Sequence, residues 1–586
     1  MQPGAMPRYP SGCLKAQGPA GEHWLLRPLV LAWTILIQPL AQFAWCSLLQ
    51  VAAILEKMFV LPFLVPAQRS GADESWRGSA EHRTYSRSEG PSTMVSVQTS
   101  CCAFQVELEL LTEHSEYFRA LSASSMRETS EHLVHLEHIP SEIFHSVLEF
   151  VFHGEFHLHS EEELLAAIEA GSYLLCRDYL QQCCSSLRGL MGPHSCLRYL
   201  QFSRLIACDE MQLVVYQYLS DGLLELASIN QTLGSEDREI LVRMRERGMP
   251  ELCMLRKENL GREPPSSDFL CRLPLSGDSW NRGTRLPFKA DKWNISVAVL
   301  WNYLFVIGGY RQKLKRGSEF RTASFRYNPI LDRWDIMAPM IKRRRHFSMA
   351  VVGQHIFAIG GWYLDVLLAP DSSTRLYSTV ERYDPWADSW SFVASLPLTD
   401  FSFSVSLSHD LPLCTACPPY IYVLGSVQRT GEKLVLQYDT RTDIWQELLP
   451  TLTRTDVNIP CLYFLGGANP LFLVGGNNEE NVVVTFSPAS QQWGQPRRMA
   501  KCTLAGQGTS MGGSFFMPAP ELNAVLEVDL ATLSAQSLPP PPRPLSYEAL
   551  VILWYPLEGS EQGWRECPKM PMTASGSLTQ RNPEEE

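Results

Sequence analysis

The side chains best suited to chemistry in this chain are two short clusters of basic residues. One cluster lies within RQKLKRGSEFR and the other within IKRRRH, and their members are Arg311, Lys313, Lys315, Arg316, Lys342, Arg343, Arg344 and Arg345. The chain as a whole is acidic, with a formal net charge of -12. Because arginine can hold a carboxylate through two parallel hydrogen bonds, the clusters predict binding of a carboxylate-rich protein segment. The net charge argues against a general nucleic-acid binder.

Histidines and cysteines offer metal-ligand chemistry, but their spacing is unfavourable. Three histidines lie three residues apart on a probable strand: His132, His135 and His138. Their side chains would alternate between the two faces of a strand and could not converge. His409, Cys414 and Cys417 are grouped, but the nearby sequence offers no fourth zinc ligand. We find no phosphate loop, nucleophile elbow or paired zinc cysteines, so we expect no metal, no cofactor and no catalytic residue.

The basic clusters lie inside a pattern that recurs through the C-terminal half. NYLFVIGGY with FRYNPILDRW is followed by HIFAIGG with ERYDPWADSW, YIYVLGS with LQYDTRTDIW, and LFLVGG with TFSPASQQW. The closing tryptophans fall 56, 55 and 48 residues apart, a period that suits a four-stranded propeller blade. The repeat residues are Gly308, Gly309, Tyr327, Trp334, Gly360, Gly361, Tyr383, Trp390, Tyr438, Trp445, Gly475, Gly476 and Trp493. We expect the Gly pairs to form turns at positive φ and the rings to pack neighbouring blades.

The pattern weakens toward the C-terminus. A fifth unit can be read in GGSFFM and VLEVDLATLSAQ, and a sixth in LVILWYP with Trp564, which has lost most of its third strand. The sequence therefore predicts an all-β propeller over 289–570 with five to six blades, irregular toward the C-terminus, and a polar acidic tail at 571–586. In an antiparallel blade the loop after the second strand and the loop after the fourth leave from one face. The two basic clusters occupy these loops of the first clear repeat and should lie side by side.

This pattern resembles the kelch repeat, whose signature is a Gly pair, then Tyr, then Trp. The resemblance covers about half of the chain, through Trp493. It implies that partner specificity is carried by loops on the face that bears the basic clusters.

Residues 93–186 contain a second recognisable pattern. Alternating Val95 and Val97 indicate a strand, and apolar residues at helical spacing follow it. The domain resembles a BTB domain, because its characteristic phrase keeps its spacing here in Phe104, Ser115, Tyr117 and Phe118. The resemblance implies an α+β fold and a homodimer through this domain. The His-Arg pair of the family phrase is replaced by Glu107 and Leu108.

Within this domain Met126, Arg127 and Glu128 match a hydrophobic-x-Glu element. The match resembles the loop through which BTB domains contact cullin-3. In such a loop the apolar side chain would be buried against the partner, and the neighbouring carboxylate would accept a charge-assisted hydrogen bond. Residues 187–260 show three- and four-residue apolar spacing and resemble a shortened α-helical BACK domain. Residues 261–288 have the composition of a linker into the propeller.

The first 92 residues form an extension with an apolar run at 24–65 and a flexible linker after it. No charged residue lies between Leu29 and Leu55, which is long enough for a membrane span. Pro39 and three glutamines interrupt the run, and its flanking charges would place the repeats outside the cytosol. That placement conflicts with the scattered cysteines, which indicate reduced thiols. We expect a cytoplasmic protein, with membrane association through 24–65 as the alternative.

Together the resemblances imply a substrate-recognition adaptor of a cullin-3 RING ubiquitin ligase. The BTB and BACK domains would engage the cullin, the kelch propeller would bind the target, and the associated ligase would transfer ubiquitin. The alternative is a non-ligase structural kelch protein that organises cytoskeletal or other protein assemblies. An enzyme such as a secreted kelch-type copper oxidase would need convergent His and Tyr ligands and an oxidising compartment, which the sequence does not indicate.

Overall fold

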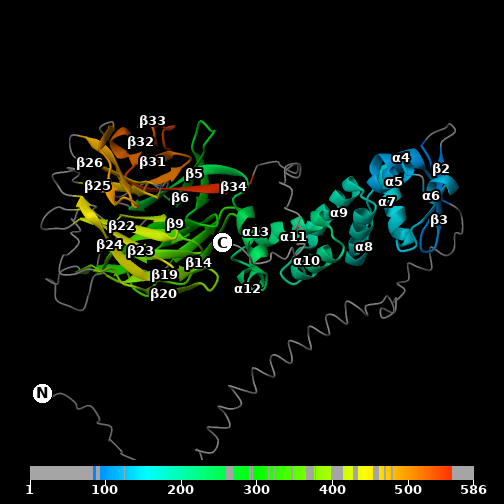
Figure 1. The fold of residues 1–586 in the computed structure, drawn as a ribbon, viewed down its shortest axis with the longest axis horizontal. Helices are drawn as coiled ribbons and strands as arrows, with labels where there is room; N and C mark the ends of the chain where they lie inside the picture. Colours follow the sequence, from blue (N-terminus) through cyan, green and yellow to red (C-terminus); the bar gives the residue numbers. More distant parts are fainter. Residues whose placement is uncertain are drawn as a thin grey trace, which may run out of the picture. The chain divides into compact units, whose positions relative to one another are not determined.

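The structure is a computed structural model that describes most of the chain between residues 83 and 556 (Figure 1). The described residues are 83–87, 93–124, 126–258, 268–288, 292–293, 295–313, 317–320, 324–344, 347–363, 375–376, 378–397, 413–426, 433–452, 461–467, 470–476, 480–499 and 502–556. The run 24–65, the tail 571–586, Lys315, Arg316, Arg345 and His409 lie outside them. Among the helices described, none has the length and apolarity needed to cross a membrane.

The N-terminal described region is an α+β domain, as its sequence predicts. Its elements are β1 (Arg83–Tyr85), β2 (Met94–Gln98), β3 (Ala103–Glu107), α4 (Leu108–His114), α5 (Glu116–Ser122), α6 (Arg127–Glu131), β4 (Leu133–His135), α7 (Ser141–His153) and α8 (Glu161–Tyr173). Strands β2 and β4 pair in parallel. Helix α7 buries Phe144, Val147, Leu148 and Val151, which share one face at three- and four-residue spacing. It ends at Gly154, which adopts the left-handed conformation that glycine favours.

A helical segment follows, and its presence confirms the predicted helical region. It contains α9 (Arg177–Leu190), α10 (Cys196–Leu205), α11 (Asp209–Asp221), α12 (Ala227–Asn230) and α13 (Ser235–Met244). Helix α11 contacts α9, α10 and α13, so it lies at the centre of the segment. Its buried face includes Val215 and Leu219, and Leu241 of α13 is buried as well.

The rest of the described chain forms a six-bladed β-propeller. Blade 1 contains β9 (Ser296–Leu300), β10 (Tyr303–Ile307), β13 (Ser324–Asn328) and β14 (Arg333–Met337); blade 2 contains β15 (Ser348–Val352), β16 (His355–Ile359), β19 (Val380–Asp384) and β20 (Ser389–Val393); blade 3 contains β21 (Leu413–Cys417), β22 (Tyr420–Ser426), β23 (Lys433–Asp439) and β24 (Ile444–Leu452). Blade 4 contains β25 (Cys461–Gly466), β26 (Leu471–Gly476), β27 (Asn481–Ser487), β28 (Gln492–Trp493) and β29 (Arg497–Met499); blade 5 contains β30 (Thr509–Met511), β31 (Ser514–Ala519), β32 (Ala524–Asp529) and β33 (Ala535–Ser537); blade 6 contains β34 (Tyr547–Tyr555), β5 (Met249–Glu258), β6 (Phe269–Pro274) and β7 (Asn281–Arg285). Strand β9 contacts β15 and β34, and β21 contacts β15 and β25, so first strands of successive blades are neighbours.

Two short ribbons extend from the loops after the second strands. In blade 1, β11 (Tyr310–Lys313) pairs with β12 (Gly317–Phe320) and with β8 (Lys292–Trp293). In blade 2, β17 (Trp362–Tyr363) pairs with β18 (Arg375–Leu376). The backbone of the first basic cluster therefore begins in a β-ribbon.

The ring closes between segments about 290 residues apart. Strand β34 pairs antiparallel with β5, from Tyr547 opposite Glu258 to Tyr555 opposite Met249. In Figure 1 the red β34 lies beside the green β5. The sequence placed 249–258 at the end of the helical connector and 261–288 in a linker, whereas the structure has strands β5, β6 and β7 there. These strands carry no Gly pair and no Tyr–Trp pair, so the repeat pattern could not reveal them.

LVILWYP also has a different place from the one predicted. It lies in β34 and is the first strand of blade 6, and the other three strands come from the chain before the first repeat. Blade 6 therefore has all four strands, although the sequence around LVILWYP supplies only one of them. Strand β34 follows the repeats in the chain, and β5, β6 and β7 precede them.

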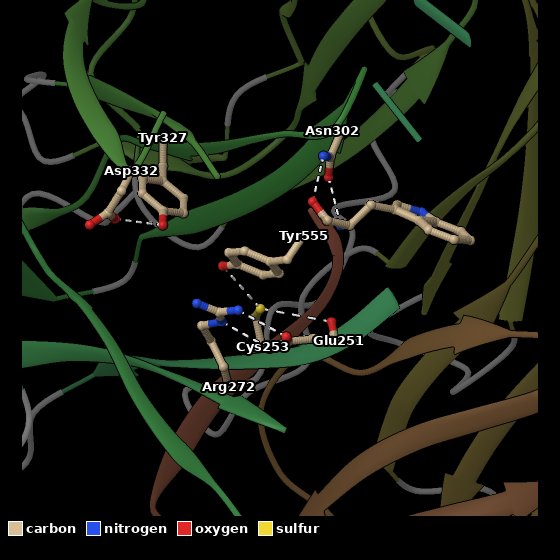
Figure 2. A network of polar contacts seen from close by, with 8 residues as sticks. Glu251, Cys253, Arg272, Asn302, Tyr327, Asp332 and Tyr555 are labelled. Atoms are coloured by element: carbon tan, nitrogen blue, oxygen red, sulfur yellow. Dashed lines mark hydrogen bonds and ion pairs between the residues drawn. The ribbon is translucent and has the colours of Figure 1, made fainter. Parts of the chain in front are cut away.

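Buried polar groups lock this closure. Glu548 on β34 accepts from Arg256 on β5 at 2.9 Å and from Arg543 at 3.2 Å, and these side chains are 0 to 6% exposed. Near the other end of β34, Arg272 donates to both oxygens of Glu251 at 2.8 Å each and its guanidinium carbon lies 3.4 Å from the ring centroid of Tyr555. Figure 2 shows this second cluster, with the Tyr555 hydroxyl facing Cys253.

The Gly pairs follow the prediction in two of three repeats. Gly308 and Gly309 have φ of 71° and 87°, and the pair at 360–361 has 68° and 88°. A side chain at Gly308 would also approach Phe347 Cε1 to 2.7 Å. Gly475 and Gly476 instead continue strand β26 and pair with β27.

The repeat rings pack both within and between blades. Tyr327, Tyr383 and Tyr438 each lie opposite the tryptophan of the same repeat, with ring centroids 4.9, 5.1 and 4.8 Å apart, and Trp493 pairs with Phe486 at 4.8 Å. The contacts predicted between blades are also present: Phe305 of blade 1 lies 5.9 Å from Tyr383 of blade 2. The same separation joins Phe357 of blade 2 to Tyr438 of blade 3.

An aspartate that the sequence analysis did not single out completes each of these repeats. Asp332, Asp388 and Asp443 have φ of 47°, 44° and 57° and accept from the repeat tyrosine hydroxyl at 2.8, 2.7 and 2.6 Å. Asp388 and Asp443 also accept from the backbone N–H of Ala338 and Ala394, which belong to the preceding blade. In each of these repeats the aspartate lies five residues after the tyrosine, and this regular spacing could have identified it from the sequence.

Candidate interaction surfaces

The first candidate surface is the propeller face that carries the predicted basic clusters. Gly308, where the ribbon loop begins, packs against Met340 and Phe347, which flank the loop after β14. The two loops therefore start side by side, as expected from blade topology. Arg311 and Lys313 lie on β11, where the structure describes their backbone only, and Lys342 and Arg343 are exposed.

Arg344 differs from Lys342 and Arg343 because it is buried. It is 1% exposed, and its guanidinium donates to Glu381 Oε1 at 2.6 and 3.1 Å. It also donates to the carbonyls of Gly360 and Thr379 at 2.8 and 2.6 Å. Its inclusion in a surface patch was therefore wrong, since a run of four basic residues gives no sign of which one turns inward.

The opposite face of blade 1 contacts the helical segment. Arg245, just after α13, is 0% exposed and donates to the Trp301 carbonyl at 2.6 Å and to Asn328 Oδ1 at 3.0 Å. Its guanidinium carbon lies 3.9 Å from the ring centroid of Tyr303. Gln231 donates to the carbonyl of Trp386 in blade 2. The helical segment thus meets the turns after the first and third strands, and the basic loops leave from the other face.

The turn at Trp301 and Asn302 joins three distant parts of the chain. Both residues have positive φ, 53° and 56°, as a two-residue hairpin of this kind requires. Asn302 donates to the Arg245 carbonyl at 3.0 Å and exchanges two hydrogen bonds of 2.8 Å with the backbone of Trp554. Figure 2 shows Asn302 at this contact. The same turn therefore holds the helical segment and the end of the closing strand.

The second candidate surface lies in the α+β domain. Met126 caps the start of α6 and is 58% exposed, and Arg127 and Glu128 are exposed beside it. Arg127 pairs with Glu131 at 2.7 Å along the same helix. The structure thus brings the three predicted residues to the surface at one helix end.

An aromatic cluster adjoins this helix. Burial raises the pKa of the Tyr117 hydroxyl, and the neighbouring Tyr173 and the Glu128 carboxylate raise it further. The rings of Tyr117 and Tyr173 lie 5.5 Å apart, and His138 lies 4.4 Å from Tyr173. Ser115 Oγ donates to the Leu174 carbonyl at 2.6 Å, which ties the start of α5 to the end of α8. The sequence analysis did not include Tyr173, which is 47% exposed, or His138 in this surface. Their place beside Tyr117 depends on the contact between α5 and α8, which no local sequence pattern indicates.

Metal-ligand candidates do not assemble in the described part of the chain. Within it, no group of three or more His, Cys, Asp or Glu residues could hold a metal ion. Cys414 and Cys417 lie on β21.

Comparison with known proteins identifies both domains. The BTB/POZ domain model matches residues 95–189, and the Kelch motif model matches residues 343–397. The chain thus contains a BTB/POZ domain and a Kelch motif. The kelch match begins at Arg343 and covers all four strands of blade 2, and the BTB match covers the surface around Met126.

Three curated relatives are 27 to 28% identical to this chain over the aligned regions. It is 27% identical over 356 residues to Kelch repeat and BTB domain-containing protein 13 of Homo sapiens, covering 61% of this chain and 71% of the relative. It is 28% identical to Kelch domain-containing protein 7A of Mus musculus, over 43% of this chain and 29% of the relative. It is also 28% identical to Kelch-like protein 36 of Bos taurus, over 39% and 35%. The chain thus spans about a third of the length of the latter two.

Proposed function

We propose that this BTB–kelch protein is a substrate-recognition adaptor of a cullin-3 RING ubiquitin ligase. Its BTB domain and helical segment would engage the cullin, and its propeller would hold the target while the associated ligase transfers ubiquitin. The chain itself would catalyse nothing. Such an adaptor would work in the cytoplasm and would form a homodimer through its BTB domain.

The observation that carries the proposal is the exposed surface around Met126. The Met126 side chain is 58% exposed and lies two residues before Glu128, whose carboxylate raises the pKa of Tyr117 in the Tyr117–Tyr173–His138 cluster. A large apolar side chain surrounded by aromatic and charged groups has the composition of a protein-binding hot spot. This surface lies in the domain whose family relatives supply the cullin contact.

The propeller face opposite the helical segment is the proposed target site. The candidates there are Arg311, Lys313, Lys315, Arg316, Lys342, Arg343 and Arg345. Since this face points away from the turns that contact Arg245 and Gln231, a target bound there would not compete with the helical segment.

The test of the adaptor proposal is direct binding of the purified chain to the N-terminal domain of cullin-3. We expect Met126→Ala with Glu128→Ala to weaken binding by about tenfold or more, the effect of removing a hot-spot contact. The matched control is Leu331→Ala with Glu447→Ala, one exposed apolar and one exposed acidic residue on the propeller, which should leave binding unchanged.

If the unmutated chain does not bind cullin-3, the adaptor proposal fails, and binding to cytoskeletal filaments would then support the structural alternative. Equal binding by the double variant and the control would show that the surface around Met126 is not the contact. Thermal unfolding of each variant checks that the fold is intact.

A further inference from the structure

The loop between β14 and β15 is anchored at both ends, and its residues 341–343 are exposed. Met340 and Phe347 are 4% and 1% exposed, and both pack beside Gly308. Between them Ile341 is 48% exposed, and Lys342 and Arg343 are exposed as well. The loop therefore presents one apolar and two cationic side chains in succession.

Glu381 of blade 2 holds the backbone of this loop. The carboxylate is 0% exposed and accepts from the backbone N–H of Ile341 at 2.7 Å and of Lys342 at 3.1 Å. The Arg344 guanidinium donates to the same carboxylate and also to the carbonyls of Gly360 and Thr379. Glu381 thus fixes the backbone of Ile341 and Lys342, whose side chains are exposed. Arg344 neutralises the buried charge of Glu381.

We propose that the triplet Ile341–Lys342–Arg343 reads an acidic protein segment that carries an apolar side chain, and that Arg344 is the positioning residue for this contact. The inference rests on the proposed target site and names its ligand chemistry. Within the described part of the chain, the side chains of Lys342 and Arg343 form no salt bridge, whereas the Arg344 side chain is fully engaged inside. A loop already held in one conformation loses less entropy on binding than a free one.

The charge of the triplet favours an acidic protein segment over other ligands. The chain has a net charge of -12, so two unneutralised cations on one rigid loop attract an acidic segment locally while the rest of the surface repels it. The exposed Ile341 adds an apolar contact, which a uniformly charged polymer would not use.

The experiment measures fluorescence anisotropy of labelled nonapeptides with the full chain. The panel varies the number and position of Asp and Glu around a single Leu, with Ser in place of Leu or of the acids as matched peptides. We expect the acidic peptides with Leu to bind most tightly, and Lys342→Glu with Arg343→Glu to weaken them about tenfold or more. Ile341→Ser should remove the preference for Leu over Ser.

The positioning role has its own readout. Arg344→Met and Glu381→Gln should both weaken peptide binding and speed amide exchange at Ile341 and Lys342, but leave the slope of log affinity against log salt unchanged. Arg343→Gln should lower that slope, because it removes a charge that contacts the peptide. Glu381→Gln keeps the shape of the side chain, so it tests the role even if Arg344→Met fails to fold.

The control is Arg333→Glu, which lies at the opposite end of β14, is 60% exposed and should not affect binding. The inference is overturned if affinity does not depend on peptide acidity, if no peptide in the panel binds, or if Arg333→Glu weakens binding as much as the loop variants. Cullin-3 binding by the same preparations reports separately on the adaptor proposal.

Discussion

Substitution of Arg245 by methionine should loosen the junction between the helical segment and the propeller. Methionine keeps much of the side-chain volume and removes every N–H donor. The carbonyls of Ser220 and Trp301 and the side-chain oxygen of Asn328 would then lose donors at 2.7, 2.6 and 3.0 Å. The nearby Glu225 and Asp221 would lose the cation that faces them.

The expected loss is about 3–5 kcal/mol of local stability. Each buried acceptor left without a donor costs about 1–3 kcal/mol, and breaking a buried charged contact costs about 3–5 kcal/mol in all. The contributions overlap because they share one guanidinium, so they do not add. Because Asn302 bonds both Arg245 and Trp554, the loss should extend to the end of β34.

Amide hydrogen exchange is the suitable assay, since a chain of several domains does not unfold in two states. We expect faster exchange in α13, at the Trp301–Asn302 turn and at the end of β34. The matched control is Arg243→Met on the same helix, which is 75% exposed and pairs only with Glu239 among the described residues. The reasoning would be refuted if the Arg245 variant lost no more than the roughly 0.5 kcal/mol expected of that exposed pair.

Two further outcomes concern buried charges. Glu548→Gln should lower the melting temperature of the propeller and cost about 3–5 kcal/mol, because it removes the charged carboxylate that pairs with the buried Arg256 and Arg543. Glu527→Gln, at a half-buried carboxylate, should change little, and equal melting of the two variants would contradict the closure model. Burial raises the pKa of Asp221 to about 6 from its ordinary value of 3.8, so the folded chain binds a proton that the unfolded chain releases between these pH values. Stability near α11 should therefore be greatest below pH 4 as far as this group is concerned and fall by about 3 kcal/mol as pH rises from 4 to 6. Asp221→Asn should abolish that dependence in exchange measured across this range, and an unchanged pH profile would rule Asp221 out.

The repeats allowed much of the propeller to be predicted. The Tyr–Trp spacing located three blades, because ring contacts between adjacent strands require large side chains at fixed positions along each repeat. The aspartate at the fifth position after Tyr has the same regular spacing, but its role appears only when its carboxylate is seen to reach both the tyrosine and the preceding blade.

The surface around Met126 was predicted in part. A three-residue match indicated Met126, Arg127 and Glu128, and their exposure depends on local helix geometry. Tyr173 and His138 join them only because the end of α8 folds back onto α5. No local pattern encodes a contact of that kind.

By itself, the sequence determined the domain types, the repeat period and the rings that pack blades 1 to 4, since these depend on spacing within tens of residues. Only the tertiary structure decided that the ring has six blades, that β5 and β34 close it, and that Arg344 is a buried anchor beside the exposed Lys342 and Arg343. The physical reason is that strand pairing across the ring and the burial of a charge depend on partners distant in the chain. Such a partner leaves no periodic trace beside the residue that it contacts.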